Sequence, residues 1–210
     1  MTLKRAKSMH EFFTTKFKTM KFTGEWLKAI GEPEQSGSWM IWGDSGNGKT
    51  RFVVQLIKYL ATFTSCAYNS LEEGESYSLQ TAFIETGIKR TTKNLVLLDK
   101  ESIEHLMVRL DKHKSPNIIV IDSIQYTGMN YKEYKKLIAR YPKKLFIFIS
   151  HSDGKNPAGR VAKSIRFDAN VKIRVEGYKA FPVSRYGGGQ PYTIWEQGAA
   201  DYWGLENTLN

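Results

Sequence analysis

Short apolar segments alternate with longer amphipathic segments along most of the chain. Two of the short segments, 118–121 and 146–149, are apolar at every position, as strands buried in a parallel sheet are. Strand and helix alternating at this spacing imply crossover connections and a mainly parallel sheet covered by helices on both faces. We therefore predict an α/β fold, with strands over 38–42, 65–69, 94–98, 117–122, 145–150 and 169–175 and helices over 49–63, 76–88, 100–113, 131–140 and 159–167.

The pattern changes at both ends of this alternating region. Beyond residue 175, segments 178–185 and 191–196 flank three consecutive glycines, which predicts an antiparallel hairpin at one edge of the sheet. The Lys-rich start predicts helices over 10–20 and 24–30. We divide the chain into a basic helical extension (1–35), an α/β core (36–197) and a loosely held tail (198–210) with Tyr202 and Trp203 as anchors.

A glycine-rich segment follows the first predicted strand. Its sequence is Gly43-Asp44-Ser45-Gly46-Asn47-Gly48-Lys49-Thr50, which matches the phosphate-binding pattern G-x-x-x-x-G-K-[ST] with a strand before it and an amphipathic helix after it. Glycine permits backbone conformations in which successive N–H groups point at a phosphate, and the N-terminus of the following helix adds partial positive charge. We expect Lys49 to reach the β- and γ-phosphates of ATP and the Thr50 hydroxyl to coordinate Mg²⁺.

A carboxylate ends one of the most apolar predicted strands. Asp122 is the last residue of segment 117–122, so it should lie at the carboxyl edge of the sheet, where ligands bind in open α/β folds. There it would hold Mg²⁺ through water while Thr50 coordinates the ion directly. The alternative is that Asp122 caps the turn after the strand.

Hydrolysis of a nucleotide needs a group that orients the attacking water. In the AAA+ class this acid directly follows the metal-binding aspartate, but here Ser123 occupies that position. Glu72 and Glu73 stand just past the strand predicted over 65–69 and are the candidates. Alternatively, both are acids favoured by the positive end of the next helix.

Four further motifs share the order and spacing of a known family. They are Tyr68-Asn69-Ser70-Leu71-Glu72-Glu73, Ile121-Asp122-Ser123-Ile124-Gln125, Ile149-Ser150-His151 and Ser184-Arg185-Tyr186-Gly187. Together with the glycine-rich segment, they resemble the RecA-like ATPases, most closely the RadA branch and its hexameric replicative-helicase relatives, over about residues 36–197. The resemblance implies a Mg²⁺-dependent ATPase that assembles as a homo-oligomer, either a hexameric ring or a filament.

The resemblance also implies roles for single residues. Glu72 falls where the family keeps its water-activating glutamate, with Glu73 as the adjacent acid. His151 matches a polar sensor of the γ-phosphate, with a structural hydrogen-bonding histidine as the alternative. Arg185 matches an arginine that reaches the nucleotide of a neighbouring subunit, but Val183 stands where the RadA branch has lysine, which leaves open whether Arg185 acts in trans.

Segment 152–163 follows His151 and occupies the position of a mobile, DNA-contacting loop in RecA-like proteins. Glycine and proline favour mobility here, and four cations are candidate partners for DNA phosphates: Lys155, Arg160, Lys163 and Arg166. The first aromatic residue in this region is Phe167, so we expect contacts with the backbone of single-stranded DNA rather than base stacking. An ordinary solvated basic loop is the alternative.

Composition and charge narrow the choice of partner and compartment. The 210 residues include 31 Lys and Arg against 21 Asp and Glu, a net charge of +10, which favours a polyanionic partner. The single cysteine, Cys66, excludes a disulfide framework and a multi-cysteine zinc site. No apolar segment approaches the length of a membrane span and no signal-peptide pattern is found, so we expect a cytoplasmic protein without a membrane partner.

The Lys-rich N-terminus has two interpretations. It is either a DNA-binding arm or a helix that docks on a neighbouring subunit through Phe12, Phe13 and Phe17.

Three functions are compatible with these patterns. The first is an ATP-hydrolysing motor that acts on single-stranded DNA in recombination, repair or replication. The second is a non-motor NTPase, such as a helicase loader or a regulatory switch, that acts on a protein partner. The third is a small-molecule kinase, against which stands the lack of an arginine-rich lid segment.

Overall fold

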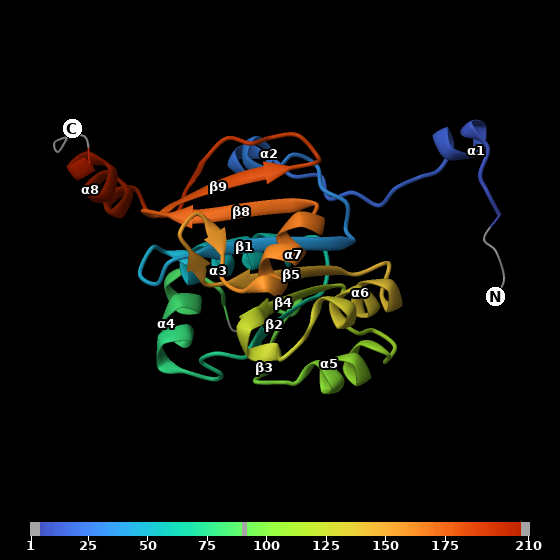
Figure 1. Cartoon of the computed structure of the whole chain (residues 1–210). Coiled ribbons are helices and arrows are strands. Elements are labelled where there is room, and N and C mark those ends of the chain that lie inside the picture. Colours follow the sequence, from blue (N-terminus) through green and yellow to red (C-terminus); the bar gives the residue numbers. More distant parts are fainter. Residues whose placement is uncertain (1–4, 90–91, 207–210) are drawn as a thin grey trace.

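A mixed β-sheet forms the centre of the protein. The computed structural model describes residues 5–89 and 92–206, and within them eight strands lie in the order β10-β9-β8-β1-β5-β4-β2-β3 (Figure 1). Their bounds are β1 (Gly37–Gly43), β2 (Cys66–Ser70), β3 (Leu95–Asp99), β4 (Ile118–Asp122), β5 (Leu145–Ser150), β8 (Val171–Glu176), β9 (Lys179–Ser184) and β10 (Tyr192–Thr193).

The direction of the strands divides the sheet into two parts. Each neighbouring pair from β3 to β8 is parallel, whereas β9 runs antiparallel to β8, and β10 antiparallel to β9. The predicted α/β fold with a C-terminal antiparallel hairpin is therefore confirmed.

Helices cover both faces of the sheet (Figure 1). The described helices are α1 (Met9–Phe13), α2 (Gly24–Ile30), α3 (Lys49–Leu60), α4 (Tyr77–Glu85), α5 (Ile103–Leu110), the short 3₁₀ helix η1 (Ile124–Thr127), α6 (Tyr131–Arg140), α7 (Arg160–Asp168) and α8 (Glu196–Glu206). A small separate hairpin pairs β6 (Ser152–Asp153) with β7 (Asn156–Pro157). None of the helices in the described ranges has the length and apolar character needed to cross a membrane.

Alternate side chains of the central strand β1 enter two different cores. Trp39 and Ile41 pack in one core with α2, α3 and α4, whereas Met40 and Trp42 pack in the other with α5, α6 and α7. All four side chains are almost completely buried. Burial on both faces stabilises β1, so its apolar residues follow one another without polar residues between them. Polar residues are accommodated where a strand ends, at the edge of the sheet.

The N-terminal helix is shorter than the one predicted over 10–20. It spans Met9–Phe13, and the chain continues without regular structure until an isolated bridge pairs Thr19 with Glu34. The hydroxyls of Thr14 and Thr15 donate to the carbonyls of His10 and Glu11, which gives those helix-end carbonyls side-chain partners in place of further helical turns.

The C-terminus also differs from the loosely held tail predicted over 198–210. Helix α8 continues to residue 206, and residues 207–210 lie outside the described ranges. Trp203 anchors this helix to the sheet, since its indole N–H donates to the carbonyl of Gly177 at 3.0 Å and its ring meets Phe181 edge-on.

Candidate nucleotide-binding site

The glycine-rich segment forms the loop that connects β1 to the N-terminus of α3. Gly48 has a φ of 88°, in the left-handed region, and a Cβ on it would lie 2.8 Å from the ring of Tyr178. Gly43 passes so close to β8 that a Cβ would lie 2.3 Å from the carbonyl oxygen of Val175. Both positions therefore require glycine, and the loop's path depends on them.

Asn47 holds the loop against the turn between β8 and β9. Its side-chain oxygen accepts from the N–H of Gly177 at 2.8 Å, and its backbone carbonyl accepts from the N–H of Tyr178 at 3.2 Å. This predicted loop residue thus fixes the loop from outside the cavity, a role that its position in the motif did not indicate.

A cavity of about 280 Å³ lies between this loop and the ends of the neighbouring strands. Most of the predicted site residues meet in it. Its lining consists of Asp44, Ser45, Gly46, Gly48, Lys49, Thr50, Arg51, Glu72, Glu73, Asp122, His151 and Tyr178.

The strand register explains why residues so far apart in the sequence meet. Strands β2, β4, β5 and β1 are parallel neighbours, so their carboxyl ends lie at one edge of the sheet. Ser70 pairs with Asp122, and Trp42 pairs with Ser150. Glu72 follows β2 by two residues and His151 follows β5 directly, so both reach the cavity from this edge.

Lys49 is the cation at the centre of the cavity. Its ammonium donates to the carbonyl oxygen of Gly43 at 3.0 Å. Burial lowers the pKa of Lys49, and the nearby carboxylates of Asp122, Glu72 and Asp44 act against that shift. A partly buried ammonium at the start of α3, where the helix N-terminus adds partial positive charge, suits a ligand that carries several negative charges.

Asp122 is a half-buried carboxylate at the end of β4. Burial raises its pKa above the ordinary value, opposed by a hydrogen bond from the Tyr68 hydroxyl and by the charge of Lys49. Burial and the adjacent Asp122 charge raise the pKa of Tyr68 well above its usual range, so Tyr68 stays a donor. Sequence reasoning missed this role of Tyr68, because a tyrosine within a buried strand reads as core.

The oxygen donors around Lys49 fit a magnesium ion. The Thr50 hydroxyl has no hydrogen-bond partner in the described part of the chain, and the Asp122 carboxylate lines the same cavity. The described residues contain no cluster of three or more His, Cys, Asp or Glu side chains able to hold a metal by themselves. Two protein oxygens, with phosphate oxygens and water completing the shell, are the arrangement that Mg²⁺ prefers at nucleotides.

The two candidate acids have different surroundings. Glu72 Oε2 lies 3.4 Å from His151 Nε2 and 3.3 Å from the hydroxyl of Ser123, and the backbone N–H of Glu72 donates to the Asp122 carbonyl. Glu73 instead accepts from the hydroxyl of Ser76, the residue that caps the N-terminus of α4. The Glu72 carboxylate thus contacts the polar side chains of His151 and Ser123 at the cavity, whereas the Glu73 carboxylate contacts the residue that caps α4.

Contacts around His151 link the cavity to the β6–β7 hairpin. The hydroxyl of Ser152 donates to the Asp44 carboxylate of the loop. Gln125 donates to the Ser150 hydroxyl at 2.7 Å and to the carbonyl of Ala158 at 3.0 Å, which connects the end of β5 with the start of α7. The sequence did not indicate this contact of Ser152, because serine is common in polar loops and no motif distinguishes this one.

The four cations predicted to contact DNA fall into two pairs. Lys163 forms an ion pair with Asp153 at 2.8 Å, and Arg166 donates to Asn156 at 2.7 Å while its guanidinium covers the ring of Trp42. These two side chains hold the β6–β7 hairpin on α7. Lys155 and Arg160 are exposed and form no ion pair with any described residue.

Arg185 lies far from the cavity of its own chain. It follows Ser184, which pairs with Val171, and Val171 in turn pairs with Trp39 of β1. Trp39 precedes Gly43 by four positions, so Arg185 stands about 13 Å or more from the loop, near the opposite edge of the sheet. The exposed Arg185 side chain therefore has no access to the nucleotide site of the same copy.

Comparisons with known proteins establish the fold. No protein-family model and no curated protein matches the sequence. Among solved structures, the flagellar accessory protein FlaH from Methanocaldococcus jannaschii is similar with a TM-score of 0.61 and 17% identity, over 83% of this chain and 92% of that chain. A KaiC-like protein from Pyrococcus horikoshii OT3 is similar with a TM-score of 0.58 and 17% identity, over 84% and 94%. These similarities show a RecA-like α/β fold, and the finer resemblance to the RadA branch stays a prediction.

The raised pKa of Asp122 predicts a pH-dependent gain in stability for Asp122→Asn. The pKa of Asp122 in the folded protein lies above the ordinary value of 3.8. At a pH above the folded pKa, the ionised carboxylate therefore lowers the free energy of unfolding. Below about pH 3.8 Asp122 is protonated in the folded and in the unfolded protein, and this loss disappears. The variant keeps an acceptor for Tyr68. It should therefore raise the free energy of unfolding at pH 7, without nucleotide or Mg²⁺, and the gain should shrink toward about pH 4.

Urea unfolding at the two pH values measures this effect. Asp153→Asn is the control, because its exposed carboxylate pairs with Lys163, which lowers its pKa, so the control should give no gain. A loss of stability in Asp122→Asn at pH 7, or a gain independent of pH, would contradict the assignment.

Proposed function

We propose that this chain is a Mg²⁺-dependent ATPase that hydrolyses ATP in the cavity between the glycine-rich loop and the ends of β2, β4 and β5. The observation that supports this most is the position of Glu72. Its carboxylate lies in the same cavity as Lys49 and Asp122 and within 3.4 Å of His151. An acid so placed, opposite a phosphate-binding lysine, is suited to orient and deprotonate water.

The roles of the residues follow from their charges. Lys49 and the loop N–H groups balance the charge of the β- and γ-phosphates. Glu72 accepts a proton from the attacking water while the bond between the γ-phosphorus and the bridging oxygen breaks, which releases ADP and phosphate. Thr50 and Asp122 would hold Mg²⁺, which would supply further charge neutralisation on the phosphates when bound.

His151 is suited to sense whether the γ-phosphate is present. Its Nε2 lies beside Glu72, and the next residue, Ser152, contacts Asp44 of the loop. A change in charge at the γ-phosphate position alters the partner available to His151, and β6 begins directly after it. We therefore propose that the nucleotide state is passed to the β6–β7 hairpin through these two residues.

Arg185 supports a homo-oligomeric ATPase. It is exposed and lies near the sheet edge opposite to its own cavity, so any action on ATP requires a second copy. A guanidinium brought to a transferring phosphoryl group stabilises the charge that develops there. We propose a ring or filament in which Arg185 of one copy faces the nucleotide of the next.

Glu72→Gln separates ATP binding from hydrolysis. The amide keeps the size of the side chain and cannot accept the proton from water, so the variant should bind ATP with wild-type affinity and release phosphate at least about 100-fold more slowly. Phosphate release and ATP binding are measured on the same preparations.

Glu73→Gln is the matched control, because its carboxylate faces Ser76. It should retain most of the wild-type rate. If Glu73→Gln alone abolishes hydrolysis, the neighbouring acid is the base, and if neither substitution slows phosphate release, a base at this strand end is excluded.

We also propose single-stranded DNA as the polyanionic partner. Lys155 at the turn of the β6–β7 hairpin and Arg160 at the start of α7 are exposed cations without an ion-pair partner in the described ranges. Lys163 and Arg166 hold the hairpin on α7 through Asp153 and Asn156. Lys155 and Arg160 therefore project from an ordered segment. Contacts of this kind are made with phosphates and are tolerant of sequence.

Single-stranded DNA should stimulate ATP hydrolysis by the wild-type chain, and added salt should weaken that stimulation steeply. Lys155→Ala and Arg160→Ala should keep the basal rate and lose most of the stimulation. Lys112→Ala, an exposed lysine just after α5, should behave as wild type. Turnover that is indifferent to DNA in the wild type would overturn this proposal and favour a switch that acts on a protein partner.

A further inference from the structure

The turn between β8 and β9, which we call the β8–β9 turn, consists of Gly177 and Tyr178. Both residues have a positive φ, 51° for Gly177 and 56° for Tyr178. Glycine adopts this left-handed conformation readily, whereas a bulky residue such as tyrosine adopts it rarely. A residue in such a conformation persists only where the surrounding structure holds it in place. Tyr178 must therefore be held by its neighbours.

The N–H groups of the β8–β9 turn face the glycine-rich loop. The N–H of Gly177 donates to the side-chain oxygen of Asn47 at 2.8 Å, and the N–H of Tyr178 donates to the Asn47 carbonyl at 3.2 Å. The Asn47 amide nitrogen donates in turn to the carbonyl of Ser45 at 3.4 Å, within the loop. The Tyr178 ring lies against Gly48 and lines the nucleotide cavity. The turn thus supports the loop at several positions.

The carbonyl groups of the same turn face the C-terminal part of the described chain. The indole N–H of Trp203 in α8 donates to the carbonyl of Gly177 at 3.0 Å. The backbone N–H of Ile194 donates to the carbonyl of Tyr178 at 2.9 Å. The ring of Tyr202 lies so close that a Cβ on Gly177 would lie 2.3 Å from it. The turn is therefore enclosed between the glycine-rich loop and α8.

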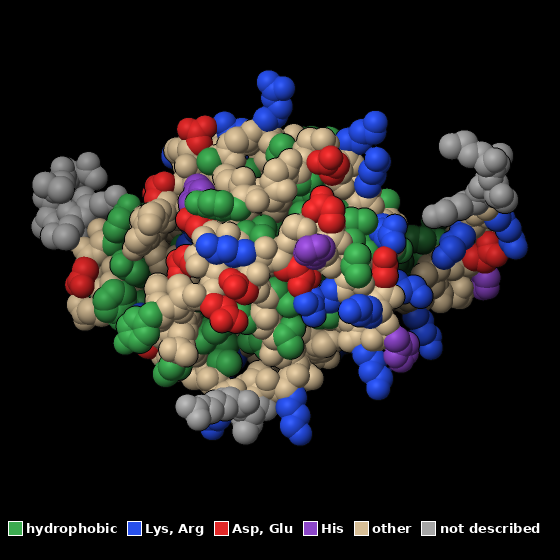
Figure 2. All heavy atoms as spheres, turned by 90° about the horizontal axis from the view of Figure 1, so that it is seen from below, with side chains coloured by type: hydrophobic (Ala, Val, Ile, Leu, Met, Phe, Trp, Pro, Cys, Tyr) green, Lys and Arg blue, Asp and Glu red, His purple; other side chains and the backbone are tan. Residues whose placement is uncertain are grey.

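The two ends of the described chain differ in charge. In Figure 2 most Lys and Arg side chains lie toward the side that carries the N-terminal arm (residues 5–18) in Figure 1, and few lie toward the side that carries α8. The sequence has no Lys or Arg after Arg185. The Trp203 ring packs edge-on against Phe181 of β9, with ring centroids 5.8 Å apart. The position of α8 therefore depends on packing and a hydrogen bond rather than on ion pairs.

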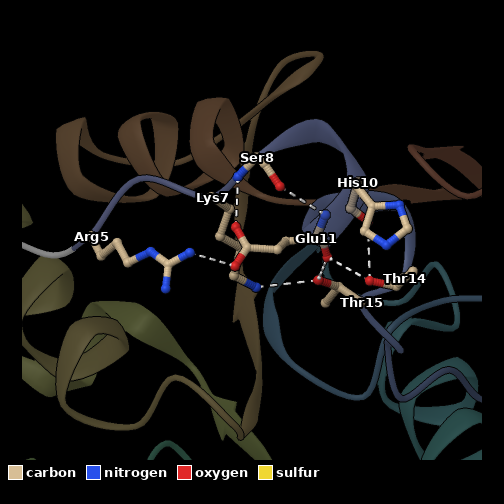
Figure 3. A network of polar contacts seen from close by, with 7 residues as sticks. All are labelled: Arg5, Lys7, Ser8, His10, Glu11, Thr14 and Thr15. Carbon is tan, nitrogen blue, oxygen red and sulfur yellow. Dashed lines mark hydrogen bonds and ion pairs between the residues drawn. The ribbon is translucent and has the colours of Figure 1, made fainter.

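The N-terminal arm is held in a different way from α8. Its helix α1 contains no buried residue and begins with a reciprocal capping box of Ser8 and Glu11. Arg5 pairs with Glu11 at 2.7 Å, and Lys7 donates to the hydroxyl of Thr15 at 3.2 Å (Figure 3). Figure 1 shows that the arm projects from the side of the molecule opposite to α8. The arm is thus ordered by contacts within itself, whereas α8 is bonded to the turn that supports the glycine-rich loop.

We propose that α8 stabilises the ATP-binding shape of the glycine-rich loop through the β8–β9 turn, and that Trp203 is a positioning residue for ATP. Trp203 holds the carbonyl of Gly177, and the N–H of Gly177 holds Asn47 of the loop. Loss of the outer contact lets the turn, and with it the loop, adopt other conformations. ATP must then order the loop as it binds, which weakens the affinity without changing the reacting groups. The inference rests on the proposed binding of ATP in this cavity.

Trp203→Phe tests the proposal, because phenylalanine keeps an aromatic ring near Phe181 and removes the donor to Gly177. Titration calorimetry with ATP and Mg²⁺ should show an affinity about threefold to tenfold lower than that of the wild type, with an unchanged number of sites per chain. In steady-state hydrolysis KM should rise and kcat should stay the same, because Trp203 lies outside the nucleotide cavity. A fall in kcat or in the number of sites, with unchanged affinity, would show a general loss of folded protein and overturn the proposal.

Trp39→Phe is the matched control. It also replaces an indole by a phenyl ring, but the N–H that it removes has no hydrogen-bond partner in the described part of the chain. The control should therefore bind ATP with wild-type affinity. An equal loss of affinity in both variants would mean that the loss comes from packing. Unchanged affinity in Trp203→Phe would mean that α8 does not act on the loop, and either result overturns the proposal.

Asn47→Ala tests the route between α8 and the loop. The substitution removes the acceptor of the Gly177 N–H, so the turn loses part of its hold on the loop. In this background Trp203→Phe should lower the ATP affinity by a clearly smaller factor than in the wild type, because the two residues act through one turn. Losses that multiply without any coupling would exclude the route through the β8–β9 turn.

Hydrogen exchange without nucleotide separates this inference from the proposed function. The amides of Gly177 and Tyr178 should exchange faster in Trp203→Phe than in the wild type, and at the wild-type rate in Trp39→Phe. A wild type that binds no ATP would overturn the proposed function together with the role of Trp203 in it. A wild type that binds ATP, with unchanged exchange at the turn in Trp203→Phe, would overturn this inference alone.

Discussion

The meeting of parallel strand ends at one edge of the sheet is the constraint on which the whole site depends. Glu72, Asp122 and His151 lie at or just past the ends of β2, β4 and β5, at the edge of the sheet where β1 leads into the glycine-rich loop. The half-buried Asp122 carboxylate would be costly alone, and Lys49 and the Tyr68 hydroxyl offset part of that cost. Charged groups are thus concentrated at a place where the apolar cores on both faces of the sheet hold them in position.

Much of this arrangement could be predicted because it repeats a simple rule. A residue at or just past the end of a buried strand lies at the sheet edge, and that rule located Asp122 and Glu72 without any knowledge of contacts, whereas His151 was found through the resemblance to RecA-like ATPases. The loop motif was recognisable because its glycines are required by close approaches, as at Gly43 and Gly48. The antiparallel addition after β8 was predicted from the change of pattern beyond residue 175 and the three glycines that follow, whereas the order of the strands across the sheet was not predicted.

The missed features depend on contacts between segments distant in sequence. Tyr68 reads as a core residue until the register of β2 and β4 places its hydroxyl on Asp122. Lys163 and Arg166 read as free cations, but the β6–β7 hairpin folds back and engages both. The amphipathic pattern near the N-terminus predicted a longer helix, because periodicity alone does not reveal that the arm has no body to pack against.

The proposed function connects three surfaces of one chain. In this proposal the cavity hydrolyses ATP, the hairpin beside His151 responds to the nucleotide, and the exposed Arg185 of one copy approaches the ATP of the next. Each of these proposed roles rests on a described contact or on an exposed, unpaired group, and an experiment can exclude one of them without excluding the others.

Binding of ATP with Mg²⁺, measured by titration calorimetry on the wild-type chain and on Lys49→Ala, tests the central claim most directly. The wild type should bind ATP only weakly when Mg²⁺ is chelated and tightly when it is present, because phosphate charge is shared between the ion and Lys49. Lys49→Ala, with an unchanged fold, should lose at least about tenfold in affinity or fail to bind. Equal affinity in the two proteins would contradict a phosphate-binding role for this cavity.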